Sequence, residues 1–182
     1  MSKNWIKGRE GTPVIGIAGW KKSGKTTLTV RLVAEFTQRG LRVATVKHAH
    51  HDFQIDEGAT DSARHRQAGA SEVAIVSAKR WAIVHELADA PEPELADVLA
   101  WLSPCDLIIV EGYKTAAIPK IEARRTEAHQ HTPLADRDPH VVAVAADHPV
   151  ADKRLPVFAL DDIVRLADFI ATAVGPLGSS RS

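Results

Sequence analysis

The sequence predicts an α/β protein with a mostly parallel sheet between helix layers. Apolar, β-rich runs alternate with helical segments along the 182 residues, which is the pattern of βα units. Two of these runs, at 107–110 and 141–144, are apolar at every position, as in parallel strands that are buried on both faces. The runs at 73–77 and 81–85 are too close for a crossover helix, so we expect a hairpin as an antiparallel addition to the sheet.

Strands and helices can be placed along the whole chain. We expect strands at 14–18, 41–46, 73–77, 81–85, 107–110, 120–123, 141–145 and 157–160. Helices are expected at 25–39, 60–68, 92–102 and 161–174. The first helix ends at Gly40, because glycine suits the position after a helix, and the last begins at the acidic pair Asp161-Asp162, which suits an N-cap. The segment 120–125 departs from simple alternation of strands and helices.

Length and composition indicate one globular domain, residues 1–174, followed by a small, polar, flexible tail at 175–182. Lys plus Arg equals Asp plus Glu, at 23 each, so the net charge of zero argues against general binding to nucleic acid or to a membrane surface. The single cysteine, Cys105, has no partner for an internal disulfide, and the N-terminus lacks the apolar stretch of a signal peptide. We therefore expect a cytoplasmic protein.

Residues 19–26 read GWKKSGKT, a complete match to the phosphate-loop pattern G-x-x-x-x-G-K-[ST] between a strand and a helix. This context predicts a P-loop NTPase fold, in which backbone N–H groups at a helix start bind phosphates. Lys25 would reach the β- and γ-phosphates and act in catalysis, and the hydroxyl of Thr26 would hold Mg²⁺. The nucleotide-binding residues expected here are Gly19, Lys22, Ser23, Gly24, Lys25, Thr26 and Thr27.

A second acidic position lies at the end of the buried run at 107–110. Ligands of open α/β sheets gather at the carboxyl ends of strands, so Glu111 occupies the place of a Walker-B acid near Mg²⁺. The alternative is a surface glutamate at a strand end. Gly112, which permits close approach of the backbone, and Lys114, which adds charge beside a phosphate site, favour a metal or catalytic role.

The segment 47–62 follows the second strand and holds three histidines and four acids. Histidine and carboxylate together suit a transition metal, whereas Asp52, Asp56 or Asp61 could hold Mg²⁺ beside a phosphate. A solvated polar loop and a simple helix cap at 60–62 are the alternatives. On the next helix, Arg64 and Gln67 share a face. Arg64 or His65 could hold a phosphate or pterin-like anion, and a solvated helix face is the alternative.

These blocks together resemble the MobB-like adaptor family of molybdopterin-guanine dinucleotide biosynthesis. The resemblance covers residues 14–125 and rests on GWKKSGKTT at 19–27, RVATVKHAHHDFQID at 42–56, DSARHRQAGA at 61–70, DLIIVEGYK at 106–114 and IPKIEARR at 118–125. The phosphate loop is shared by many families, whereas the KHAHHDF and EGYK blocks in this order are far more particular.

The resemblance implies GTP with Mg²⁺ as cofactors, weak GTP hydrolysis and a homodimer. It also implies a molybdopterin guanylyltransferase as partner, with this chain assisting that enzyme and not catalysing guanylyl transfer itself. On this interpretation the segment after the second strand faces molybdopterin, and the candidate contacts are His48, His50, His51, Asp52, Asp61, Arg64 and Lys114. Related dimeric ATPases carry a signature lysine at the position of Trp20, so a lysine acting across the dimer is not expected from this loop.

Guanine preference has little direct support in the sequence. GTPases use an N/T-K-x-D element after a late strand, and Asp147 follows the run at 141–145 in a suitable place, but without the lysine. Asp147 is thus a candidate nucleotide ligand or a turn residue. Two other functions remain open: a small-molecule kinase with a lid built from Arg124, Arg125 and Arg137, and a metal-delivery protein that uses the three histidines.

Overall fold

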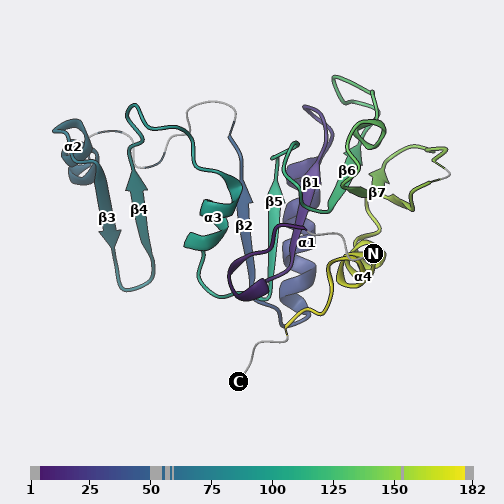
Figure 1. Cartoon of the computed structure of the whole chain (residues 1–182), viewed down its shortest axis with the longest axis horizontal. Coiled ribbons are helices and arrows are strands. Elements are labelled where there is room, and N and C mark those ends of the chain that lie inside the picture. The colour runs from purple at the N-terminus through teal and green to yellow at the C-terminus, as the bar shows by residue number, and fades with distance from the viewer. Residues whose placement is uncertain (1–4, 50–54, 56–57, 59, 153, 179–182) are drawn as a thin grey trace. The chain divides into compact units, whose positions relative to one another are not determined.

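The computed structural model describes residues 5–49, 55, 58, 60–152 and 154–178. The chain forms two compact units, one of Met1–His48 with Glu94–Ser182 and the other of Ala49–Pro93. Figure 1 draws both units, coloured along the chain. A single domain over residues 1–174 stays a prediction.

The larger unit is built on a six-stranded sheet in the order β2-β5-β1-β6-β7-β8, in which all neighbours are parallel. Most of these strands lie side by side in Figure 1. Their bounds are β1 Val14–Ala18, β2 Val43–Lys47, β5 Leu107–Glu111, β6 Lys120–Arg124, β7 Val141–Ala146 and β8 Val157–Ala159. The predicted mostly parallel sheet is therefore confirmed.

Both faces of this sheet are buried, and alternate residues of one strand enter different cores. Ile15 of β1 and Ile109 of β5 pack in the core that includes helices α1 (Lys25–Gln38) and α4 (Ile163–Val174). Val14 and Ile108 pack instead with α3 (Leu95–Trp101). This two-sided burial explains why β1 and the first four residues of β5 are apolar at every position. Strand β6 differs, because it carries the buried charged residues Lys120 and Glu122.

Local chemistry explains where several predicted bounds shift. Helix α3 begins three residues later than expected, after Pro91 and Pro93, since the residue before a proline avoids helical angles. Strand β2 begins at Val43 because the N–H of Leu41 still closes the end of α1, on Phe36 O at 3.1 Å. The departure at 120–125 is confirmed: β6 lies parallel between β1 and β7, and the connection from β5 contains no helix.

The smaller unit contains α2 (Asp61–Gln67) and the hairpin of β3 (Glu72–Val76) and β4 (Trp81–His85). The hairpin is confirmed, with Val73 opposite Val84, and the antiparallel addition takes the form of a separate two-stranded sheet. In β3 the buried Val73 and the half-buried Ile75 alternate with exposed residues, and β4 is exposed except at the half-buried Val84, so the hairpin has one face to cover. Among the described residues of this unit, Val73 of β3 and Ala63 of α2 are buried.

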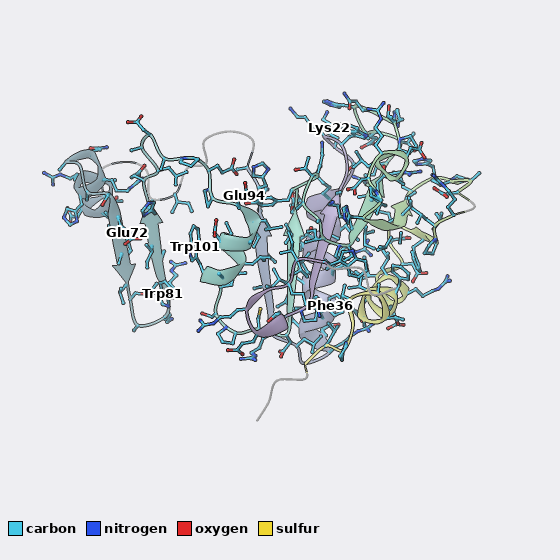
Figure 2. All side chains as sticks on the ribbon, in the orientation of Figure 1. Lys22, Phe36, Glu72, Trp81, Glu94 and Trp101 are labelled. Atoms are coloured by element: carbon cyan, nitrogen blue, oxygen red, sulfur yellow. The ribbon has the colours of Figure 1, made fainter. Side chains whose placement is uncertain are left out.

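Helix α1 begins at the carboxyl end of β1 and runs toward the opposite ends of the strands. Figure 2 labels Lys22 in the loop beyond the carboxyl end of β1 and Phe36, which is fully buried, toward the other end of α1. Two short 3₁₀ helices, at Arg9–Gly11 and Leu134–Asp136, complete the unit. In the predicted tail, Leu177 packs against the core, and residues 179–182 lie outside the described residues. Among the described helices, none is long and apolar enough to cross a membrane.

Candidate functional site

The loop between β1 and α1 has a backbone that only glycine permits at its first position. Gly19 has φ 153°, and an added Cβ would lie 2.3 Å from Ser23 Oγ and 2.6 Å from the carbonyl oxygen of Ala123. Gly24 has φ 87° and precedes α1, whose N-terminus carries no side-chain cap. The first N–H groups of α1 are thus available to a ligand, as a phosphate loop requires.

Glu111 and Thr26 meet at the carboxyl edge of the sheet. Strands β1 and β5 are neighbours, with Ile17 opposite Glu111, and Thr26 Oγ1 donates a hydrogen bond to Glu111 Oε1 at 2.7 Å. Glu111 is buried, and Lys47 Nζ from the end of β2 lies 3.8 Å from the same carboxylate oxygen. A hydroxyl and a carboxylate at this spacing are oxygen donors of the kind that Mg²⁺ prefers, so the residues present fit this ion.

Lys25 is half-buried and lies among other cations. Its ammonium donates to the carbonyl oxygen of Trp20 at 2.8 Å. Burial lowers the pKa of Lys25, Lys114 and Lys47 lower it further, and Glu111 opposes them. An anion at this position would relieve that electrostatic cost, which is the behaviour expected of a phosphate ligand.

The chain turns sharply after Glu111. Gly112 has φ 96°, and Tyr113 has φ 46°, a left-handed angle that is uncommon for a residue with a side chain. The ring of Tyr113 lies 4.6 Å from that of His48. Lys114 follows, with its Nζ 4.2 Å from the centre of the Trp20 ring. The turn therefore brings the end of β5 back to the phosphate loop.

A cavity of about 590 Å³ adjoins the phosphate loop at Thr27. It lies where β7 and β8 end, and its wall includes Arg31, Asp147 and Phe158. The volume falls in the range of small-molecule sites, which run from about 300 to 1,000 Å³. A nucleoside could occupy it with its phosphates directed along Thr27 toward the loop.

Asp147 borders this cavity but is also held by the protein. Its Oδ1 accepts hydrogen bonds from the backbone of Thr126 at 2.9 Å and from the ring of His148 at 2.9 Å, and its Oδ2 lies 3.5 Å from Arg125 Nε. The bond from His148, followed by those from Thr126, lowers the pKa of Asp147. The carboxylate thus ties the ends of β6 and β7 together, and Oδ2 is the oxygen with more capacity for a ligand.

The structure brings most predicted residues of the larger unit to one edge. Six of them lie in or beside the phosphate loop and carry the geometry given above: Gly19, Gly24, Lys25, Thr26, Glu111 and Lys114. Lys22 is exposed with φ 65°, and Ser23 is buried, its Oγ without a hydrogen-bond partner in the described structure.

The predicted residues of the segment after β2 are only partly described. His50, His51, Asp52 and Asp56 lie outside the described residues. Asp61 and Arg64 belong to the smaller unit, where their side chains are exposed and 3.7 Å apart. The expected cap is present, since Thr60 Oγ1 accepts from Ala63 N at 3.2 Å. Within the described part of the chain, no cluster of three His, Cys, Asp or Glu could hold a metal ion.

Two of the arginines considered for a kinase lid are engaged elsewhere. Arg124 bonds to the buried carboxylate of Glu122 at 2.8 Å, and Arg125 lies against Asp147. Sequence reasoning gave no role to Arg31 or Phe158 in the cavity wall. Arg31 lies one helical turn after Thr27, and that spacing was the available signal.

Fold and site together define a P-loop protein of the α/β class. The chain also matches the family model MobB, described as Molybdopterin guanine dinucleotide synthesis protein B, over residues 14–147. The chain therefore belongs to the MobB family.

Relatives and solved structures agree with this assignment. A molybdopterin-guanine dinucleotide biosynthesis adapter protein of Haemophilus influenzae is 40% identical over 161 residues, which is 87% of each chain. One of Escherichia coli is 38% identical over 169 residues, 91% of this chain and 95% of its own. A crystal structure of molybdopterin-guanine biosynthesis protein B aligns with a TM-score of 0.67 at 28% identity, covering 88% of this chain and 99% of that one. A MobB homologue from Bacillus stearothermophilus aligns with a TM-score of 0.65 at 30% identity, covering 88% and 97%.

Proposed function

We propose that this chain is a GTP-binding adaptor in the biosynthesis of molybdopterin guanine dinucleotide. Its relatives carry that adapter role in their names, and the matched family model spans both the phosphate loop and Glu111. One observation carries the nucleotide part of the proposal: the phosphate loop, the Thr26–Glu111 pair and the 590 Å³ cavity adjoin one another on the larger unit.

Each residue has a defined task in this proposal. The N–H groups of the loop and Lys25 bind the β- and γ-phosphates, while Thr26 and Glu111 hold Mg²⁺, which neutralises phosphate charge when bound. Asp147 and the cavity beyond Thr27 receive the base and ribose. Arg124 and Arg125 are paired with carboxylates, so GTP hydrolysis is expected to be slow without a further positive group.

The remaining parts of the proposal concern the assembly. The protein is a cytoplasmic homodimer that presents GTP, or molybdopterin, to a molybdopterin guanylyltransferase, and guanylyl transfer belongs to that partner. The net charge of zero removes one barrier to self-association. Sedimentation should then give twice the 19.7 kDa of the chain.

Titration with GTP and with ATP, each with Mg²⁺, tests the nucleotide part. We expect tighter binding of GTP, and loss of most affinity for both nucleotides in Lys25→Ala with an unchanged circular dichroism spectrum. Equal or tighter binding of ATP would remove the guanine assignment. A pull-down on the immobilised protein with GTP present tests the adaptor part. It should retain a purified molybdopterin guanylyltransferase, and failure to retain that enzyme would contradict the role.

A further inference from the structure

We propose that Lys114 is a second phosphate-binding lysine, held over the phosphate loop by the ring of Trp20 so that it meets the terminal phosphate of a bound nucleotide. This role deepens the proposed function and rests on it. The sequence placed Lys114 beside a phosphate site, and the resemblance also made it a candidate contact of molybdopterin. The proposal gives it one task, toward the nucleotide.

The first support is the path of the chain between Glu111 and Lys114. Two successive left-handed residues, Gly112 and Tyr113, redirect the backbone as β5 ends. A left-handed angle at a bulky residue such as Tyr113 is strained and persists only where its surroundings enforce it. The contact between the Tyr113 and His48 rings, and the hydrogen bond from His48 N to Glu111 O at 2.9 Å, supply that enforcement.

The second support is the way in which Trp20 is fixed. Its indole N–H donates to the carbonyl oxygen of Thr132 at 2.7 Å, which sets the ring plane. One face of the system then receives the ammonium of Lys114, at 4.2 Å from the ring centre, a distance typical of a cation–π contact. The backbone carbonyl oxygen of Trp20 accepts a hydrogen bond from the ammonium group of Lys25. Trp20 therefore positions two lysines, one through its ring and one through its backbone.

The third support is electrostatic. Lys25 and Lys114 both place their ammonium groups against Trp20, the first on its carbonyl oxygen at 2.8 Å and the second 4.2 Å from its ring centre. Two cations placed together without an anion between them repel one another, and a phosphate chain is a ligand that would make this arrangement favourable. Lys47, 3.8 Å from Glu111, already has a carboxylate partner, so Lys114 is the lysine better placed to meet an added phosphate.

The proposal makes affinity depend on the number of phosphates. Calorimetry should show that Lys114→Ala lowers the affinity for GTP about tenfold, because the lost charge faces the terminal phosphate. The affinity for GDP should fall by less, and the affinity for GMP by less than about twofold. Lys114→Arg should restore most of the affinity, since arginine also binds both a ring face and a phosphate. Arg9→Ala is the matched charge control, because Arg9 is exposed and lies at the end of the sheet opposite the phosphate loop. Its neighbour Thr12 bonds to Cys105 O, just before β5 begins.

The role of Trp20 is tested in the same series. Trp20→Leu should lower the affinity for GTP about threefold while keeping the carbonyl group that holds Lys25. The double variant, with Trp20→Leu and Lys114→Ala, should bind GTP no more weakly than Lys114→Ala alone. Additive losses would overturn the positioning by Trp20.

Two outcomes separate this proposal from the nucleotide assignment. If ATP binds as well as GTP, the guanine assignment fails, and the comparison of ATP, ADP and AMP still decides the role of Lys114. If GTP binds and Lys114→Ala lowers the affinities for GTP, GDP and GMP equally, or leaves them unchanged, the role of Lys114 is refuted and the nucleotide site stands. If inorganic tripolyphosphate and every nucleotide fail to bind the unaltered protein, both proposals are refuted.

Discussion

Replacing Gly19 with alanine should damage the phosphate loop through a definite clash. The added methyl group would lie 2.3 Å from Ser23 Oγ, which can rotate away, and 2.6 Å from the carbonyl oxygen of Ala123, which cannot. The second distance is about 0.8 Å short of ordinary van der Waals contact, so the loop has to move by most of that amount away from β6. A displacement of about 1 Å in a positioned group costs up to about a hundredfold in function.

We therefore expect Gly19→Ala to bind GTP about ten to one hundred times more weakly. Its matched control is Gly40→Ala, at φ 83° after α1, where an added methyl group meets nothing within 4 Å. That variant should lose about 1–2 kcal/mol of stability in urea denaturation and keep its affinity for GTP. If Gly19→Ala is folded and binds GTP within twofold of the unaltered protein, the geometry assigned to the loop is wrong.

Three further predictions follow from other contacts. Asp138→Ala should lower the free energy of unfolding by about 3 kcal/mol, because it leaves the fully buried ammonium of Lys120 without the carboxylate that lies 2.7 Å away. Asp138→Asn should lower the free energy of unfolding by less, and equal losses in the two variants would contradict the role of this ion pair. Glu111→Ala should abolish the Mg²⁺ dependence of GTP hydrolysis and retain binding of GTP measured in EDTA; a hydrolysis rate still responsive to Mg²⁺ would exclude Glu111 as a ligand. The third prediction concerns pH. The pKa of Lys25 in the folded protein lies below 10.5, so the unfolded chain holds this proton more tightly. The free energy of unfolding should therefore increase as the pH rises from the folded-state pKa toward 10.5. Lys25→Met should flatten that rise in denaturation measured across alkaline pH.

The sequence predicts the sheet well because two-sided burial leaves a local signature. Runs such as 107–110 are apolar throughout, and their alternate residues enter two different cores. The order of the strands leaves no such signature. Alternation along the chain does not reveal that β6 lies next to β1, nor that the hairpin forms its own sheet. Both depend on pairings between segments distant in sequence.

The candidate site divides in the same way. The contact between Thr26 and Glu111 could be anticipated, because both follow from the rule that ligands gather at the carboxyl ends of strands. The contact between Trp20 and Lys114 could not, because it depends on two left-handed residues, and only one of them, Gly112, is a residue type that suggests such angles. Asp147 was considered as a guanine ligand from its position, whereas its bonds to Thr126 and His148 required the structure.

The order of the sheet explains why opposite charges collect at the phosphate loop. Strand β5 lies between β1 and β2, so the residues that end these three strands or follow them meet at one edge. Lys47 and Glu111 end β2 and β5, and Lys25 begins the helix after β1. Burying an unpaired charge is costly, so the charged residues of β2 and β5 stand at the ends of these strands. The charges buried within β6 are paired, Lys120 with Asp138 and Glu122 with Arg124. Lys114 reaches the same edge only because the backbone reverses at Gly112 and Tyr113. A change that relaxes this turn should therefore weaken phosphate binding without altering Lys25, Thr26 or Glu111.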